Sequence, residues 1–203
     1  LEFCHGARKQ QISHANLRDF VSTWKGFADE TKNEMRRMVD FCRKADNLSL
    51  RDDSYFELKE PRSKKNPNMK KVFNDGELEK AIEFFNEGRL LAFECPVKIR
   101  KSSTDNDVVA SFLVYLQKDP ELMEKSHTVI RRGLTIIGEK RIREPGIRAL
   151  LLAEDDDLSE FLGDAENPAH TRWLHSTKHF KGKYYNGSAT LSYIQNMTQL
   201  LSK

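Results

Sequence analysis

The stretch LLAFECPVKIR, residues 90–100, decides the fold class of this chain of 203 residues. From Leu91 to Ile99 every second residue is apolar, whereas Glu94 and Lys98 stand among the residues between them. A repeat of two residues is that of a β-strand, in which successive side chains point to opposite faces. The same repeat returns at 108–116 after a polar turn. The two segments therefore predict a pair of neighbouring antiparallel strands.

Two more segments extend this β region. Residues 129–137 are β-like, and IRALLLA at 147–153 is a nearly continuous apolar run, typical of a central strand buried on both faces. The sequence thus predicts an α/β fold with a mixed, mainly antiparallel four-stranded sheet over about 89–153, flanked by helices. We expect two parts, a helical and loop-rich arm over 1–88 and an α/β domain over 89–203.

Helical patterns lie on both sides of the strands. Apolar residues recur every three or four positions over 14–46, where Gly26 favours two helices or one bent helix. A long polar and basic loop is expected over 47–74. Asp75 is expected to cap a helix that ends near Gly88.

The region after the strands contains further helix signals. Asp157 or Ser159 can cap a short helix that extends through Leu162. Pro168 suits the first turn of a following helix. An apolar face over 189–201 predicts a C-terminal helix.

Composition excludes several classes of protein. Charged residues make up 32% and apolar residues 38%, and no apolar run approaches the eighteen residues of a membrane span, so no membrane contact is expected. The net charge of +3 is too balanced to indicate a nucleic-acid binder by itself. Three widely spaced cysteines form neither a disulfide framework nor a CxxC metal site, which favours the reducing cytoplasm. Because the chain starts without Met or a signal segment, we expect it to be an internal piece of a longer protein.

The basic residues gather in two stretches, 59–71 and 131–148. Such clusters are typical either of a nucleic-acid or partner surface or of ordinary solvated loops. The candidate nucleic-acid-binding residues are Lys64, Lys65, Lys70, Lys71, Arg131 and Arg132.

Motifs for self-contained catalysis are missing or weak. Neither GxxxxGK[ST] nor GxGxxG occurs, so we expect no nucleotide to be bound by this chain alone. The acidic run after the strand at 147–153 could hold Mg²⁺, or it could complement the dipole of a helix N-terminus. One hypothesis is therefore a metal-dependent phosphodiesterase that uses Glu154, Asp155, Asp157 and His170. No zinc motif accompanies the C-terminal histidines, and we expect no metal site.

The region after residue 147 resembles a known domain. A strand is followed by an acidic turn, a short helix and the segment Asp164-Ala-Glu-Asn-Pro-Ala-His-Thr-Arg-Trp173. This order resembles the transducer domain, of ribosomal-protein-like fold, that follows the ATP-binding domain of GHKL ATPases. MutL-type proteins carry a His-Pro-Ala-Lys-like segment there, MORC ATPases a Pro-Ala/Thr-His-Asn-Lys segment, and the heat-shock chaperones an Arg-bearing loop. The Arg-Gly strand of the chaperones is similar to 129–136, and the resemblance covers about 89–180.

The resemblance implies a role for the loop around Arg172. Its cation would reach the γ-phosphate of ATP in the neighbouring domain, with Lys178 as the second candidate and with His170 and Asn167 on the cofactor side. ATP and Mg²⁺ would be held mainly by an upstream ATP-binding domain absent from this chain. The sequence departs from the family because Thr-Arg-Trp replaces the usual Lys-containing tripeptide.

The loop around Arg172 also allows a purely structural interpretation. Arg172 could instead pair with Glu166 or Asp164 at the surface. The leading hypothesis is a transducer and adaptor piece of an ATP-driven machine, of the kind found in bacterial DNA metabolism or phage defence, with DNA and a second copy of the chain as further expected partners. The alternative is a stand-alone nucleic-acid or protein interaction module.

Overall fold

The computed structural model describes the chain except for residues 1, 6, 7, 12–16, 24, 66, 105, 124 and 140, and it describes only the backbone of 2–5, 8–11, 17 and 20. The chain divides into two compact units, Leu1–Leu48 and Ser49–Lys203. The boundary expected at 88/89 therefore lies within the second unit.

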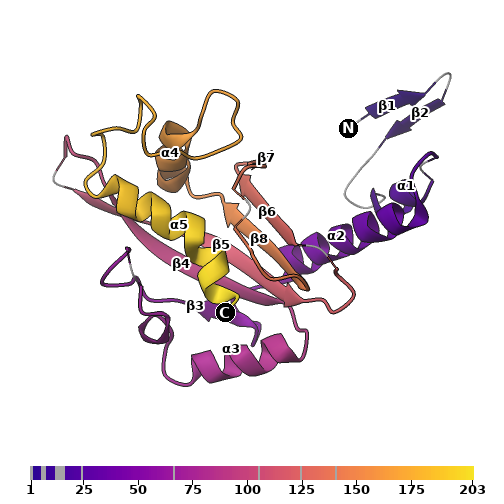
Figure 1. Cartoon of the computed structure of the whole chain (residues 1–203), viewed down its shortest axis with the longest axis horizontal. Coiled ribbons are helices and arrows are strands. Elements are labelled where there is room, and N and C mark those ends of the chain that lie inside the picture. The colour runs from indigo at the N-terminus through magenta and orange to yellow at the C-terminus, as the bar shows by residue number, and fades with distance from the viewer. Residues whose placement is uncertain are drawn as a thin grey trace. The chain divides into compact units, whose positions relative to one another are not determined.

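The first unit contains a short hairpin and two helices (Figure 1). Strands β1 (Glu2–His5) and β2 (Arg8–Gln11) pair antiparallel, and helices α1 (Leu17–Ser22) and α2 (Asp29–Asn47) follow. Gly26, at φ 89°, lies between the helices, so the predicted interruption occurs there. Arg36 Nε donates to Ser22 Oγ at 2.9 Å and links the two helices. Positions 14–16 and Trp24 of the predicted helix lie outside the described residues.

The second unit is built on a six-stranded sheet of order β3-β4-β5-β8-β6-β7 (Figure 1). The strands are β3 (Tyr55–Glu57), β4 (Leu91–Arg100), β5 (Asp107–Lys118), β6 (Ser126–Arg131), β7 (Leu134–Thr135) and β8 (Ile147–Ala153). The pairs β3–β4 and β6–β8 are parallel, and the other three pairs are antiparallel. The predicted α/β class with a mixed, mainly antiparallel sheet is confirmed.

The sheet has two strands more than the four predicted. β3 lies in the segment expected to be loop, and its three residues pair with Ala92 to Glu94 of β4. The single stretch predicted at 129–137 divides into β6 and β7, because Arg132 (φ 45°) and Gly133 (φ 73°) turn the chain back on itself. The predicted β4–β5 pair is confirmed, with Phe93 opposite Val114.

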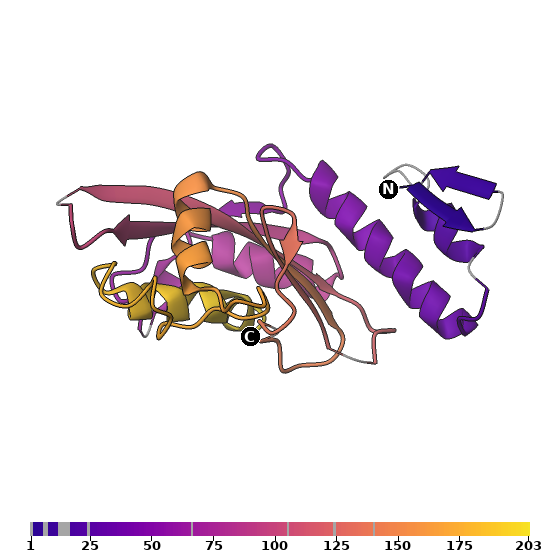
Figure 2. The ribbon, with the colours of Figure 1, turned by 90° about the horizontal axis from the view of Figure 1, so that it is seen from above.

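One face of the sheet forms the core with three helices. The helices are α3 (Glu77–Asn86), α4 (Asp156–Ala165) and α5 (Gly187–Leu201), and their apolar residues belong to the same buried cluster as alternate residues of β4, β5 and β8. Figure 2 shows α3 and α5 on the same side of the sheet. Almost every residue of β8 is buried, as expected for a central strand. No described helix is long and apolar enough to cross a membrane.

The connection between α4 and α5 differs from the prediction. Asp155 caps α4, since its Oδ1 accepts from Leu158 N at 2.9 Å, whereas Asp157 lies in the first turn and Ser159 is buried. Pro168 starts no helix, and the chain continues through turns to α5. The aromatic rings of this connection pack on α4, with Phe180 and Tyr184 centred 5.0 and 4.7 Å from the Phe161 ring. These contacts hold the segment that follows the loop around Arg172 against the core.

Candidate functional site

The segment Glu166–Trp173, here called the sensor loop, folds back on itself directly after α4. Glu166 and Trp173 form an isolated antiparallel bridge. Inside it, Asn167 N donates to Arg172 O at 3.0 Å, and His170 N donates to Asn167 O at 2.9 Å. His170 has φ 53°, in the left-handed region that a tight reversal requires. This turn takes the place of the helix expected at Pro168.

The side chain of Asn167 holds the sensor loop from within. Its Oδ1 accepts from the backbone N–H groups of Thr171 at 2.9 Å and Arg172 at 3.0 Å. Its Nδ2 donates to Thr171 Oγ1 at 3.0 Å. Asn residues stabilise turns in this way because a short amide can replace backbone partners. Asn167, predicted on the cofactor side, is therefore engaged inside the loop.

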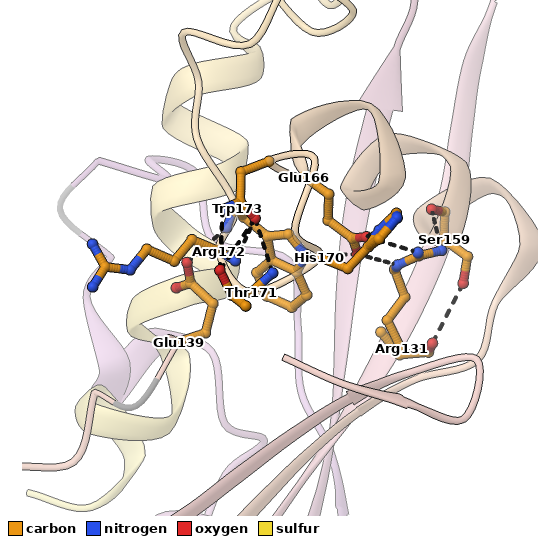
Figure 3. Close-up of polar contacts among 10 residues, drawn as sticks. Arg131, Glu139, Ser159, Glu166, His170, Thr171, Arg172 and Trp173 are labelled. Atoms are coloured by element: carbon orange, nitrogen blue, oxygen red, sulfur yellow. Dashed lines mark hydrogen bonds and ion pairs between the residues drawn. The ribbon is translucent and has the colours of Figure 1, made fainter. Parts of the chain in front are cut away.

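A mostly buried ion pair fixes the base of the sensor loop (Figure 3). Arg131, at the end of β6, donates from Nε to Glu166 Oε1 at 2.5 Å and from Nη2 to Oε2 at 3.0 Å. The side chains of Glu166 and Arg131 are 2% and 13% exposed. Two parallel bonds between a guanidinium and a carboxylate are among the strongest hydrogen-bonded pairs in proteins.

Two further side chains use the same carboxylate. Trp173 Nε1 donates to Glu166 Oε1 at 3.3 Å, and His170 Nδ1 lies 2.7 Å from Oε2. Although burial raises the pKa of Glu166, its hydrogen bonds to Arg131, His170 and Trp173 outweigh burial and hold that pKa below its ordinary value. Glu166 is therefore an ionised anchor at neutral pH.

The opposite side of the sensor loop is held by the segment after β7. Gly138 N donates to Thr171 O at 2.7 Å, and Glu139 Oε1 accepts from Trp173 N at 2.8 Å. Gln195 of α5 donates to Glu139 Oε2 at 3.0 Å. A Cβ at position 138 would lie 2.6 Å from Thr171 O, so only glycine allows this close approach.

Arg172 projects from this braced loop. Its side chain is exposed and extends away from the buried cluster in Figure 3. Within the part of the chain that the structure describes, its guanidinium has no hydrogen bond or ion pair. The surface partners considered from the sequence are both occupied: Glu166 is bound as above, and Asp164 Oδ2 accepts from Lys183 Nζ and from Tyr184 OH, each at 2.5 Å.

The other two residues implied by the resemblance are placed differently. His170 belongs to the sensor loop and is 63% exposed, although its Nδ1 is bound to Glu166. Lys178 is exposed in the turns that follow the loop, between Thr177 and Phe180. The structure thus brings Asn167, His170 and Arg172 together in one loop.

The predicted nucleic-acid-binding residues do not form one surface. Lys65, Lys70 and Lys71 are exposed, and Lys64 donates to Lys98 O at 2.7 Å. Lys70 and Lys71 lie in the 3-10 helix η1 (Met69–Lys71). Arg131, in contrast, is the last residue of β6 and is bound to Glu166, and Arg132 directly follows the strand and pairs with Asp156.

The acidic run supports the structure of α4. Asp155 caps the helix and Asp156 pairs with Arg132, while His170 is bound to Glu166. Among the described residues no group of three metal-ligating side chains could hold an ion. The arrangement therefore offers no support to the phosphodiesterase hypothesis.

Several residues of the site carry no signal in the sequence. Gly138, Glu139 and Gln195 contact the sensor loop across separations of 22 to 34 residues, and nothing in their local sequence patterns indicates these contacts. Comparison with protein-family models, curated proteins and solved structures finds no match to this chain.

Proposed function

We propose that this chain is a transducer and adaptor of an ATP-driven machine, and that Arg172 contributes a cation to the γ-phosphate of ATP held by a neighbouring domain. The observation that carries the proposal is an exposed guanidinium, without a described partner, on a loop whose backbone is braced on both sides. The residues that brace it come from β6, from the segment after β7 and from α5.

This arrangement suits the stabilisation of a phosphoryl group. A cation that is already positioned needs little reorganisation when negative charge develops on the phosphate oxygens. Arginine remains charged at every physiological pH, and its planar fork matches two phosphate oxygens. ATP with Mg²⁺ would supply the transferable phosphoryl group, and this chain would supply the sensing cation.

The neighbouring residues take different parts in the proposal. Asn167 positions the backbone of Arg172, so it would act through the arginine. His170, fixed by Glu166, lies in the same loop and would be the second group to face the nucleotide. Lys178 is the alternative cation. An upstream ATP-binding domain is the proposed partner, in the cytoplasm, where Cys42 and Cys95 would stay as the free thiols found here.

The test measures ATP hydrolysis by the protein that carries the ATP-binding domain together with this chain. Arg172→Ala is expected to lower kcat by about a thousandfold, the scale of an arginine finger. Because Arg172 is exposed, its removal should leave the thermal midpoint of the protein unchanged. Arg172→Lys keeps the charge without the fork and should retain part of the activity.

Lys178→Ala tests the alternative cation, which is exposed a few residues away from Arg172. The chain alone should bind no ATP in an equilibrium titration. Full turnover in both Arg172→Ala and Lys178→Ala would contradict the proposal, as would ATP binding by the isolated chain.

A further inference from the structure

A basic cavity lies between the loop after β3, the end of β4 and the start of α5. Its volume is about 700 Å³, and the described residues that line it include Arg62, Lys64, Lys65, Lys98, Arg100 and Tyr185. A second cavity of about 520 Å³ shares the wall formed by residues 60–63 and adds Lys59 and Lys71. We call the first hollow the basic cavity.

The charge of its lining is strongly positive. Five of the lining side chains are cationic and two are acidic. Both acids are neutralised within the wall, because Glu60 pairs with Lys64 at 3.1 Å and Asp107 with Lys98 at 3.6 Å. The remaining positive charge favours an anionic ligand, since like charges gathered around a hollow attract counter-ions.

Two of the cations are open to a ligand. Arg62 and Lys65 are exposed, and among the described residues their charged groups have no ion pair or hydrogen bond. Lys71, in the adjoining cavity, is likewise exposed, and its ammonium group has no ion pair or hydrogen bond to a described residue. Several cations along a continuous wall suit a chain of phosphates better than a single one.

The start of α5 adds to the positive field. The first turn of this helix, which begins at Gly187, contains no acidic residue, and no side chain caps its N–H groups. Asn186, Ala189 and Thr190 place this positive end of the helix dipole in the cavity wall.

An aromatic ring completes the lining. Tyr185 is 63% exposed, and its backbone N–H donates to Arg100 O at 2.9 Å, which places the residue beside the end of β4. The Arg100 guanidinium lies 5.5 Å from the ring centroid. Exposed aromatic rings beside a basic groove are the stacking platforms on which proteins hold unpaired bases.

We propose that the basic cavity binds single-stranded nucleic acid, with Arg62 and Lys65 on successive phosphates and Tyr185 stacked on a base. Single strands are favoured over duplexes because the ring of Tyr185 can reach a base only when that base is unpaired. The cavity is separate from the sensor loop, so this inference goes beyond the proposed function and does not depend on it.

The test is fluorescence anisotropy of a labelled twenty-nucleotide thymidine strand, titrated with the chain at several salt concentrations. Binding should weaken steeply with salt. Arg62→Ala with Lys65→Ala should lower the slope of log Kd against log salt by about 1.4, the value for two phosphate contacts on a single strand. Tyr185→Ala should weaken binding about tenfold, whereas Tyr185→Phe should keep it, because stacking needs the ring and not the hydroxyl.

The matched control is Lys118→Ala with Lys125→Ala, which removes two exposed cations. Lys118 lies at the far end of β5 from Asp107, about 35 Å away for a strand of this length. The affinity and the salt slope of this double variant should equal those of the unaltered chain. The same is expected of Arg172→Ala.

Four outcomes would overturn the inference. They are absence of binding even at low salt, an unchanged salt slope in the Arg62/Lys65 variant, equal or tighter binding of a duplex of the same length, and displacement of the strand by inorganic polyphosphate at the same phosphate concentration. The last two would identify the ligand as a duplex or as phosphate alone.

Discussion

The sensor loop and the basic cavity use the same kind of side chain in opposite ways. At the sensor loop Arg131 is mostly buried, and its guanidinium is bound at two points to Glu166. At the basic cavity Arg62 and Lys65 are exposed, and the acids nearby are already paired with other lysines.

The difference separates cations that build the fold from cations that a ligand can reach. A buried charge loses its hydration, so it persists only where a partner and hydrogen bonds replace the water. An exposed lysine or arginine keeps its hydration and gains little from a surface partner. Arg131 therefore positions the sensor loop, whereas the charges of Arg62 and Lys65 remain accessible to a ligand.

The largest expected effect is on the buried pair. Glu166→Ala removes the carboxylate that binds Arg131, His170 and Trp173, and it leaves a guanidinium largely buried and uncompensated. We expect the free energy of unfolding to fall by about 3 kcal/mol. Urea denaturation followed by tryptophan fluorescence measures this loss, because Trp173 is buried in the folded chain.

The residue directly after β6 provides the control, since Arg132 pairs with Asp156 at the surface. Asp156→Ala should change the free energy of unfolding by less than about 1 kcal/mol.

The dependence of stability on pH gives a second measure of the contribution of Glu166. Because the pKa of folded Glu166 lies below the ordinary 4.5, its contribution is present above that pH and is lost as the pH falls through the lower folded value. Glu166→Gln should flatten this loss, and equal acid sensitivity would contradict the assignment.

A smaller effect is expected where the sensor loop touches Gly138. In Gly138→Ala the new Cβ would meet Thr171 O at 2.6 Å and Arg172 Cγ at 2.4 Å, so the loop must shift. The expected loss of stability is about 1–3 kcal/mol. The loss should appear in the same urea denaturation, together with a lower rate of ATP hydrolysis in the protein that carries the ATP-binding domain.

Gly163→Ala is the matched control because the same methyl group would enter α4 with its nearest neighbour, Arg131 Nη1, at 3.6 Å. This is an ordinary contact, and alanine is preferred to glycine in a helix by about 0.5–1 kcal/mol. The control should therefore be as stable as the unaltered chain or more so. If Gly138→Ala left the free energy of unfolding unchanged, the loop would be able to shift and would not be held rigidly.

The sheet could largely be predicted from the sequence because its longest strands alternate over many residues. The repeat at 91–99 and 108–116 correctly predicted the β4–β5 pair. β3 has only three residues, which is too short for a period of two to be recognised. Its place in the sheet depends on pairing with β4, which lies 37 positions further along the chain at Tyr55–Ala92.

The candidate site could be predicted only where its residues are neighbours in sequence. Asn167, His170 and Arg172 belong to one motif and do form one loop. The partners that hold it are distant, since Arg131 is 35 positions from Glu166 and Gln195 is 56 positions from Glu139. The sequence placed Arg131 among nucleic-acid-binding residues because a local run of basic residues does not show which of them is buried.

The smallest expected effect distinguishes the two regions most directly. Glu60→Gln removes a negative charge from the basic cavity. In the unaltered chain Glu60 Oε1 accepts from Lys98 N at 3.1 Å, and the amide oxygen of glutamine can accept the same bond. The pair with Lys64 is only partly buried, so its loss should change the free energy of unfolding by less than about 1 kcal/mol. The cavity becomes more positive, so the thymidine strand should bind up to about fivefold more tightly. Removal of an acidic side chain would thus destabilise the fold at Glu166 and strengthen nucleic-acid binding at Glu60. Weaker binding of the strand by Glu60→Gln would contradict this difference between the two regions.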